Sequence, residues 1–526
     1  MRKIRSIVIV GGGSSGWMTA AMLSKVLFDV KIVLVESKNV PKIGVGEAST
    51  PPLTWFMRGL GFPSVPSWLS KCDGTIKTGV FFKNWYEQGD QYWHPFEAID
   101  YIDDQHHVGH GWLQLHRNGY SPFANRSSFY QAFFPTTAVN VDSCRGPIVP
   151  TFAHHLDADL LGSVLKEACP HVERIIDDVL DVKLNEQGEI SALITADHGM
   201  VSADLFVDCT GFRRKLISKV SPNQPFESYG ASLFCDRAVV IRIPYSSPSS
   251  KAHEMHPYVQ ADAQPAGWIW TIPLFSRLSY GYVFSSSFST DSDAEAHLRS
   301  YLGLERTKGA EARFVKFESG KLQNLWVKNC VAVGLSGTFI EPLESTGLYI
   351  TQMGIEFLAA MLDSRSYNDF TVDRYNMSMQ QVCNDIFHFI IAHYAFVNRE
   401  DSAFWRAVKH ETKIPEDLQP RLDLFKRLLP TRYTKTLLER WTFGDINWFA
   451  VLLGVNFPFE TPQLDHSLLE KALAIRDRKQ ERVKELLASA PSHFEWLCTE
   501  VYGQQRPASV GNALRPDRNL LSEAER

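Results

Sequence analysis

The chain has 526 residues, of which 44% are hydrophobic and 21% charged, and its formal net charge is −5. These proportions are typical of a folded protein and exclude disorder along the whole chain. With 54 basic and 59 acidic residues, the sequence also lacks the basic surface stripe of a nucleic-acid binder. The length predicts two or three domains, or one large domain with a second wrapped on it.

The eight cysteines are scattered along the sequence and form no C-x-x-C pair. This distribution predicts free thiols in a reducing compartment and no zinc finger. No apolar stretch approaches the roughly 20 residues that a membrane span requires. The N-terminus has no recognisable cleavage site for a signal peptide. We therefore expect a cytoplasmic protein that does not bind to membranes.

The first 36 residues predict a βαβ unit. Ile7–Val10 and Val30–Glu36 have the apolar pattern of buried strands, and a helix rich in Ala, Met and Leu lies between them. Strands joined by such a helix run parallel. The N-terminal part is therefore predicted to contain a parallel sheet.

The turn after the first strand carries the sequence Gly11-x-Gly13-x-x-Gly16, and Glu36 closes the second strand. Glycines in this position let a pyrophosphate approach a helix N-terminus, while the acid binds a ribose. A glycine-rich turn without a nucleotide is the alternative, which the agreement of strand, helix and acid disfavours. A later strand that ends in Asp208 and a glycine turn resembles flavoproteins of the FAD-monooxygenase type and favours FAD over NAD.

Beyond about Tyr349 the pattern becomes helical. Ser467 and Glu470 have the spacing of a capping box and predict a charged helix that ends near Pro491. We predict an FAD-binding domain over residues 1–360, a helical substrate domain over 361–505 and a polar tail over 506–526. One apolar helix face is predicted from the spacing of Tyr375, Met379, Val382, Ile386 and Phe389.

Five ordered segments carry a resemblance to the flavin-dependent tryptophan halogenases. One is the sequence W-x-W-x-I-P, and another is the long block from Gly334 to Gly347, which contains E-P-L-E-S-T-G. The resemblance implies an α/β fold, with an FAD-binding Rossmann-like domain of the flavin-monooxygenase type and a mostly helical C-terminal substrate domain. The five segments are Gly44–Ala48, Thr75–Trp85, Trp268–Pro273, Gly334–Gly347 and His393–Trp405.

The resemblance implies an oxidoreductase that uses FADH2 from a separate flavin reductase, O2 and bromide or chloride. The resulting hypohalous acid would pass to Lys77, which either hydrogen-bonds it or forms a haloamine. The halogen would then be transferred to an electron-rich small aromatic, indole or a tryptophan-like indole compound. A homodimer is compatible with the sequence.

The resemblance also implies roles for individual residues. Lys77, Glu344 and Ser345 would be catalytic, with Glu344 stabilising the cationic ring intermediate and taking the ring proton. The backbone amides of Thr346 and Gly347 would bind the halide. Trp268, Trp270, Ile272 and Pro273 would form the wall of the passage. The residues implied at FAD are Gly11, Gly13, Ser14, Ser15, Gly16, Glu36, Glu47, Ala48, Val179 and Leu335.

The region expected to bind an amino-acid substrate departs from the family. Residues 440–449 lack a Tyr-Tyr pair, so a clamp for the ammonium and carboxylate of free tryptophan is not evident. The sequence predicts that a substrate without the amino-acid group fits at least as well. The candidates for stacking on the aromatic ring are Trp93, Phe96, Trp448 and Phe449.

Two other functions and a metal site are weighed against this interpretation. An FAD-dependent aromatic monooxygenase has no use for Lys77, Glu344 and the tryptophan wall, and retention of both charged residues disfavours a non-catalytic FAD-binding protein. His106, His107 and His110 are spaced as H-H-x-x-H, which fits no zinc site completed by an acid. We therefore predict no metal.

Overall fold

A computed structural model describes residues 1–40, 47–140, 143–147, 151–437, 442–460 and 462–503. The chain divides into two compact units made of interleaved segments. Unit 1 comprises residues 1–73, 156–230 and 317–384, and unit 2 comprises 74–155, 231–316 and 385–526. The predicted boundary at residue 360 lies in the last turn of α11 (Gly347–Met361) and is not the division between the units. The predicted tail over 506–526 lies outside the described residues.

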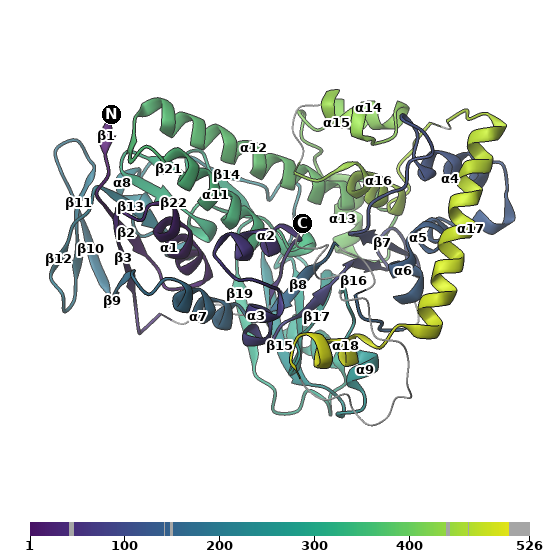
Figure 1. Ribbon diagram of the computed structural model, residues 1–526, viewed down its shortest axis with the longest axis horizontal. Helices are drawn as coiled ribbons and strands as arrows, with labels where there is room; N and C mark the ends of the chain where they lie inside the picture. The colour runs from purple at the N-terminus through teal and green to yellow at the C-terminus, as the bar shows by residue number, and fades with distance from the viewer. Residues whose placement is uncertain (41–46, 141–142, 148–150, 438–441, 461, 504–526) are drawn as a thin grey trace. The chain divides into compact units, whose positions relative to one another are not determined.

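The interleaving arises because late segments return to the N-terminal sheet. This sheet has six strands in the order β21-β22-β13-β2-β3-β9, and all neighbours run parallel except β21 and β22 (Figure 1). Strand β22 therefore belongs to the first unit although it follows β2 by more than 300 residues. The strands are β2 (Ser6–Val10), β3 (Lys31–Glu36), β9 (Glu173–Ile176), β13 (Leu205–Asp208), β21 (Trp326–Val327) and β22 (Cys330–Ala332).

Helix α1 (Ser14–Val26) joins β2 to β3, as the sequence predicted. Figure 1 shows α1 beside this sheet, and it contacts both α7 (Ala158–Ala168) and α11. The N-cap of α7 is Asp157, whose side chain accepts from two backbone amides of the first turn. The other elements of unit 1 are α2 (Pro52–Gly59), α3 (Pro66–Leu69), α8 (Ile217–Val220) and the small strands β1 (Arg2–Lys3), β10 (Val179–Leu184), β11 (Ile190–Thr195), β12 (Met200–Val201), β14 (Phe226–Ser228), β20 (Gly320–Leu322), β23 (Thr338–Phe339) and β24 (Ser366–Tyr367).

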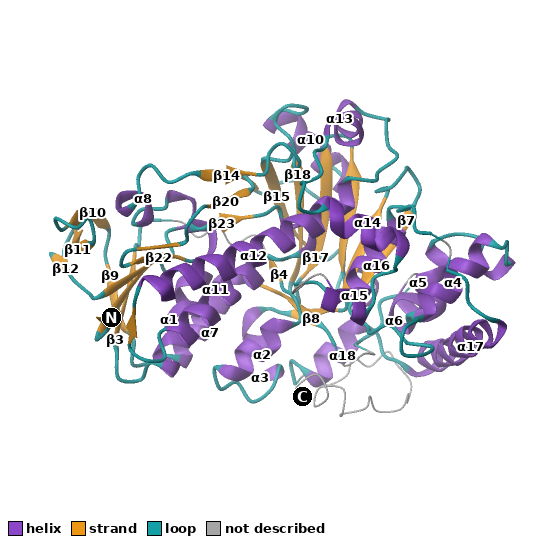
Figure 2. Ribbon diagram, turned by 90° about the horizontal axis from the view of Figure 1, so that it is seen from above, coloured by secondary structure: helices purple, strands orange, loops and turns teal. Residues whose placement is uncertain are grey.

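Unit 2 is built on a seven-stranded sheet in the order β19-β15-β18-β17-β16-β6-β7 (Figure 2). All neighbours are antiparallel except β16 and β6. Every residue of β17 is buried, and all of them except Thr271 are apolar or glycine. The strands are β6 (Gly79–Lys83), β7 (Gln91–Pro95), β15 (Arg237–Pro244), β16 (Val259–Gln264), β17 (Gly267–Pro273), β18 (Arg277–Phe284) and β19 (Ala312–Lys316).

The predicted helical segments of the C-terminal part are confirmed. Helix α12 (Asp369–Tyr394) contains the predicted apolar face. Helix α17 (His466–Ser489) begins two residues earlier than the predicted capping box, because Asp465 accepts from the amide of Leu468 and is the N-cap. The remaining helices of unit 2 are α4 (Val108–Arg117), α5 (Ser127–Phe133), α6 (Pro135–Asn140), α9 (Lys251–Glu254), α10 (Asp291–Leu302), α13 (Ala403–Glu411), α14 (Gln419–Arg427), α15 (Arg432–Leu437), α16 (Asp445–Gly454) and α18 (His493–Glu500).

Within the described ranges, none of the helices combines the length and apolar character needed to cross a bilayer.

A single carboxylate organises the carboxyl end of β13. Asp208 is fully buried, and its two oxygens accept from the backbone amides of Thr210, Leu216 and Ile217 at 2.8–2.9 Å. It also accepts from the hydroxyls of Thr210 and Ser336 at 2.7 and 3.2 Å. Asp208 therefore ties the loop after β13 to the loop after β22.

Replacing Asp208 with Ala should lower the free energy of unfolding by about 3 kcal/mol or more, because several buried donors lose a charged acceptor. Urea denaturation measures the change. The matched control is Asp181→Ala, which removes an exposed ion pair with Lys219 and should change stability by less than about 0.5 kcal/mol. Equal stability of the two variants would contradict this role of Asp208.

Candidate active site

The glycine turn after β2 leaves open space in front of a helix. Residues 11–15 are only half-buried between fully buried flanks. Gly13 is the N-cap of α1 and provides no side-chain cap, and a Cβ atom placed on Gly13 would have no atom within 4 Å. The first amides of α1 therefore face a space in which an anion can be bound.

The predicted acid lies beside this turn. A Cβ atom on Gly12 would collide with the carboxylate of Glu36, so only glycine lets the turn approach that side chain. Glu36 is buried and forms an ion pair with Arg174 of β9. Arg174 was not identified from the sequence, because nothing in its local pattern shows that β9 pairs with β3.

A second glycine turn reaches the first one. Gly334 has a φ of +69°, and a Cβ atom there would collide with the hydroxyl of Ser15. Leu335 follows in a short helical turn and is half-buried, and Ser336 donates to Asp208. The two turns, Asp208 and Glu36 thus lie at one edge of the parallel sheet, where dinucleotides bind in such folds.

Two other residues predicted at the cofactor belong to the same unit. Glu47 lies in β4 (Glu47–Ala48), and burial, with the charges of Asp159 and Asp157, raises its pKa to about 7. Val179 begins β10, and its carbonyl accepts from the ammonium of Lys215.

These residues fit FAD. The open space at Gly13, the α1 N-terminus without a side-chain cap and the close approach of the two glycine turns are what a bound pyrophosphate requires.

The block that carries Glu344 ends at the N-terminus of α11. Glu344 and Ser345 are buried, and Ser345 has a left-handed backbone conformation with a φ of 60°. Thr346 is the N-cap, but its buried hydroxyl forms no hydrogen bond with any described residue. Gly347 is exposed, with no atom within 4 Å of a Cβ position. The arrangement leaves uncapped amides and a hydroxyl at the positive end of a helix dipole, which suits an anion.

Lys77 lies in unit 2, on the short strand β5 (Thr75–Lys77), which pairs antiparallel with β8 (Ala153–Leu156). Its side chain is fully buried, and its ammonium nitrogen lies 5.1 Å from the ring centre of Phe96. A cation over an aromatic face is attractive, and more so when it is removed from water. The structure thus brings Lys77 together with one of the predicted aromatic residues.

The backbone and side chains around Lys77 are held from several sides. The hydroxyl of Thr75 donates to the carbonyl of Pro273 at 2.6 Å. The amide and hydroxyl of Thr78 both donate to the carbonyl of Pro257 at 2.7 Å. The amide of Ile76 donates to Nε2 of His493 at 3.2 Å. Pro273, predicted as part of the passage wall, therefore also fixes the strand that carries the lysine.

His493 was not identified from the sequence. It begins α18 after a capping box formed by Ser492 and Glu495, a signal that predicts the helix but not its contact with β5. Its Nδ1 donates to the carbonyl of Met255 at 3.0 Å, so both ring nitrogens are used in the neutral form. Burial lowers the pKa of His493 to about 3, which keeps it in that form.

The tryptophan pair lies on one face of β17. Trp268 and Trp270 are buried with ring centres 6.1 Å apart, and Trp268 contacts Trp85 edge-on at 6.3 Å. The ring of Trp270 lies across Gly281 of β18, where a Cβ atom would collide with it. The buried N–H of Trp270 has no hydrogen-bond partner among the described residues. Ile272, also buried, lies on the same face two residues further on.

The other predicted substrate residues have different surroundings. Trp93 stacks on Phe81 with ring centres 4.3 Å apart and is largely buried. Trp448 packs against Phe389 and Phe425, and Phe449 packs against the core in the same way; both are essentially without exposed surface. This packing favours a structural role for Trp448 and Phe449 over stacking on a substrate.

The histidine cluster of α4 has a local structural role. His107 is the N-cap of α4, accepting from the amide of Gly109, and its Nε2 donates to the carbonyl of Pro430. His106 bonds to Asp103, and His110 contacts both other rings. No group of residues in the described part of the chain has the composition of a metal site.

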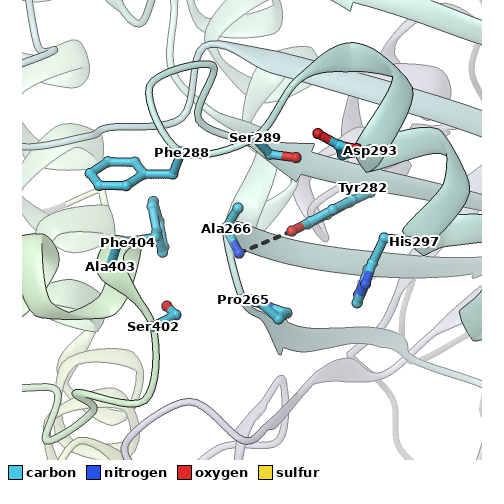
Figure 3. A pocket seen from close by; sticks show the side chains of 10 residues that line it. All are labelled: Pro265, Ala266, Tyr282, Phe288, Ser289, Asp293, His297, Ser402, Ala403 and Phe404. Atoms are coloured by element: carbon cyan, nitrogen blue, oxygen red, sulfur yellow. Dashed lines mark hydrogen bonds between the residues drawn. The ribbon is translucent and has the colours of Figure 1, made fainter.

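Unit 2 also contains a pocket of about 280 Å³ at the N-terminal ends of α10 and α13. Figure 3 shows Phe288 and Phe404 on one side of it and His297 on the other. None of its lining residues was predicted as a site residue. The lining consists of Pro265, Ala266, Tyr282, Phe288, Ser289, Asp293, His297, Ser402, Ala403 and Phe404.

The parallel sheet with its paired glycine turns defines a dinucleotide-binding protein of the α/β class. Comparison with known proteins narrows this class. The family model for tryptophan halogenases matches residues 6–470. Tryptophan 6-halogenase SttH of Streptomyces toxytricini is 32% identical over 518 residues, which cover 93% of this chain and 97% of that protein. Its crystal structure matches with a TM-score of 0.85 and covers 94% of this chain and 99% of that one.

Two further relatives are also named as halogenases. The 7-chloro-L-tryptophan 6-halogenase KtzR of Kutzneria sp. (strain 744) is 33% identical, over 93% of this chain and 98% of that protein. The structure of BrvH, a flavin-dependent halogenase from Brevundimonas sp. BAL3, is 30% identical with a TM-score of 0.80, and the match covers 95% of this chain and 100% of that one.

The chain belongs to the tryptophan halogenase family. It is a flavin-dependent halogenase and therefore an oxidoreductase, so the predicted fold class and enzyme class are confirmed.

Replacing His493 with Ala should lower the free energy of unfolding by about 1–3 kcal/mol, because the buried amide of Ile76 loses its acceptor. Thermal or urea unfolding measures this. His466→Ala is the matched control, since that side chain is 87% exposed and should contribute less than about 0.5 kcal/mol. A His493→Ala protein as stable as the control would show that His493 does not hold β5.

Proposed function

We propose that this enzyme halogenates an electron-rich small aromatic, indole or a tryptophan-like indole compound, with chloride or bromide as the halide source. FADH2 would come from a separate flavin reductase. The observation that carries the proposal is the fully buried Lys77 on its anchored strand, in a chain whose relatives include named tryptophan 6- and 7-halogenases. A cytoplasmic location and a homodimer stay predictions.

The proposed cofactor residues are those of the two glycine turns and their neighbours. The amides at the start of α1 would bind the pyrophosphate, and Glu36, held by Arg174, would bind the ribose. Reduced FAD with O2 would supply the two-electron oxidation that converts halide to hypohalous acid. The full proposed set is Gly11, Gly13, Ser14, Ser15, Gly16, Glu36, Glu47, Ala48, Val179 and Leu335.

The halide would be held at the N-terminus of α11. The amides of Thr346 and Gly347 supply N–H donors there, and the Thr346 hydroxyl has no partner among the described residues. A halide accepts hydrogen bonds but donates none, so donors at the positive end of a helix dipole match its chemistry. Ser345 would position this turn through its left-handed conformation.

The tryptophan pair would line the passage of the oxidant. Trp268 and Trp270 present a continuous aromatic surface on β17 together with Ile272. The buried N–H of Trp270, which has no described partner, offers a donor to a passing oxyacid. Because hydrocarbon and indole rings bind water weakly, such a wall also limits hydrolysis and loss of the oxidant.

Lys77 and Glu344 would act on different steps. Lys77 would hold the hypohalous acid by donating an N–H to its oxygen, and the Phe96 ring limits where the ammonium can move. The carboxylate of Glu344 would stabilise the positive charge of the ring intermediate and then take the ring proton.

Replacing Lys77 with Ala should abolish aromatic halogenation, whereas Glu344→Gln should slow it by about 10²-fold or more. Both proteins should bind FAD and oxidise FADH2 at the wild-type rate, because neither change touches the glycine turns. Product mass spectrometry and stopped-flow absorbance of the flavin measure the two quantities, with catalase present and free oxidant scavenged. Wild-type product yield from either variant would remove that residue from the mechanism.

The substrate is tested by a panel of aromatics, incubated with the enzyme, a flavin reductase and chloride or bromide. Free indole should react at least as fast as L-tryptophan at equal concentration, because residues 440–449 supply aromatic side chains but few groups that could pair with an ammonium and a carboxylate. A strong preference for tryptophan, with halogen at one benzene carbon, would contradict this expectation. Turnover of substrate without halide would favour a monooxygenase instead.

A further inference from the structure

The pairing of β5 with β8 places a histidine on the same face as Lys77. Thr75 pairs with His155 and Lys77 pairs with Ala153. Side chains alternate between the two faces of a strand, so Thr75, Lys77 and His155 share one face, and Ile76 and His154 share the other. A residue diagonal to Lys77 across such a pair lies within reach of a long side chain.

The proton on the His155 ring can be assigned from its neighbours. The hydroxyl of Thr75 has a single proton, which it donates to the carbonyl of Pro273 at 2.6 Å. Toward Nδ1 of His155, 2.8 Å away, the Thr75 oxygen can therefore only accept. Nδ1 carries the proton, and Nε2 of the neutral ring presents a lone pair.

This lone pair has no donor. His155 is fully buried, and its Nε2 forms no hydrogen bond with any described residue. Two other buried histidines of this unit, His493 and His107, use both ring nitrogens. His388 also has one ring nitrogen without a described partner, but of these two residues it is His155 that lies on the strand paired with that of Lys77. A buried acceptor without a donor is destabilising and calls for an explanation, such as a ligand that supplies the missing donor.

The ring stays neutral, so the lone pair remains available. Burial, followed by the charge of Lys77, lowers the pKa of His155 well below its usual range. The influence of Lys77 on this pKa is consistent with the shared face.

We propose that Nε2 of His155 accepts the O–H of the hypohalous acid carried at Lys77. This inference rests on the proposed function. Hypohalous acid has one O–H donor and an oxygen that accepts. With the O–H bound by His155 and the oxygen bound by an N–H of Lys77, only the halogen is left without a hydrogen bond, and it is directed toward the aromatic carbon.

The transfer step balances with these groups. The aromatic carbon forms a bond to the halogen, the O–halogen bond breaks and its electron pair stays on oxygen. The Lys77 ammonium donates a proton to that oxygen, which leaves as water while its original O–H is still bound to His155. The ring proton passes to a carboxylate, assigned above to Glu344, and solvent returns a proton to the lysine. His155 is neither oxidised nor protonated.

The test separates the two nitrogens of His155 by substitution. In His155→Asn the amide nitrogen can replace the Nδ1 donor, but the acceptor at the Nε2 position is lost. In His155→Gln the side-chain oxygen can reach the Nε2 position. His154→Asn is the matched control, because it makes the same change at the next residue, on the opposite face.

The measured quantity is the ratio of halogenated product to free oxidant released per FADH2 consumed, with a soluble thioether as the trap. We expect His155→Asn to lower this ratio at least 10-fold with FAD binding unchanged, His155→Gln to recover most of the loss, and His154→Asn to match the wild type. A wild-type ratio in His155→Asn, or the same loss in all three variants, would overturn the proposal.

A second pair of variants keeps the test decisive if the histidine variants do not fold. Thr75→Val removes the hydroxyl that fixes the ring proton, and Thr75→Ser retains it. The product-to-oxidant ratio should fall at least 3-fold in Thr75→Val and stay at the wild-type value in Thr75→Ser. An unchanged ratio in Thr75→Val would count against the assigned tautomer and the proposal.

Failure of this inference is distinguishable from failure of the proposed function. If Lys77→Ala makes wild-type amounts of product, the assignment of the lysine fails. If Lys77→Ala is inactive while His155→Asn and Thr75→Val both keep the wild-type ratio, the proposed role of Lys77 is supported and only the role of His155 is wrong.

Discussion

Burial of the Lys77 ammonium is the constraint around which unit 2 is arranged. A charge removed from water costs several kcal/mol unless its surroundings compensate. Here the aromatic face of Phe96 lies 5.1 Å from the nitrogen, and the strand that carries the lysine is fixed by bonds to Pro273, Pro257 and His493. A short, three-residue strand could not hold such a side chain by itself. The anchors come from β17, the segment before β16 and the C-terminal helix α18, so much of the unit contributes to placing one atom.

In unit 1, the sites proposed to bind negatively charged groups lie at the N-termini of two helices. Its two relevant helices, α1 and α11, begin without a side-chain cap, at Gly13 and Thr346. Leaving the first amides of a helix unsatisfied costs stability in a free protein, and the usual solution is a Ser, Thr, Asp or Asn cap. The α7 helix of the same unit has such a cap in Asp157. Helices α2 and α8 of this unit also begin without a side-chain cap, so an uncapped end alone does not mark an anion site; at α1 and α11 it coincides with the sites proposed for a pyrophosphate and a halide.

The sequence predicted the parts of the structure that depend on local pattern. The βαβ unit, the strand that ends in Asp208 and the apolar face of α12 all follow from the spacing of apolar residues and glycines, and each is present. What it did not predict depends on contacts between distant segments. Arg174 approaches Glu36 only because β9 pairs with β3, and His493 reaches Ile76 across more than 400 residues.

Aromatic residue type does not identify the substrate site either, because the contacts of each ring depend on distant segments of the chain. Trp448 and Phe449 were predicted to stack on a substrate; in the structure the ring of Trp448 packs against Phe389 and Phe425, and that of Phe449 packs against His107, Phe129 and Phe459. A buried aromatic side chain gains free energy from packing whether or not a ligand is present, so its residue type does not separate the two roles. Phe96 was predicted by the same reasoning and does lie at Lys77, which the sequence could not distinguish from the other cases.

Three buried histidines of unit 2 differ in how their ring nitrogens are used. His493, His107 and His155 are the same residue type with similar burial, and burial lowers the pKa of each below its usual range. In His493 and His107 each ring nitrogen has a partner, so the ring acts as a fixed link between two segments. In His155 one nitrogen is fixed and the other is not. Since an enzyme that handles a diffusible oxidant must orient it as well as hold it, a fixed lone pair on the lysine face provides the second contact that a single ammonium cannot supply.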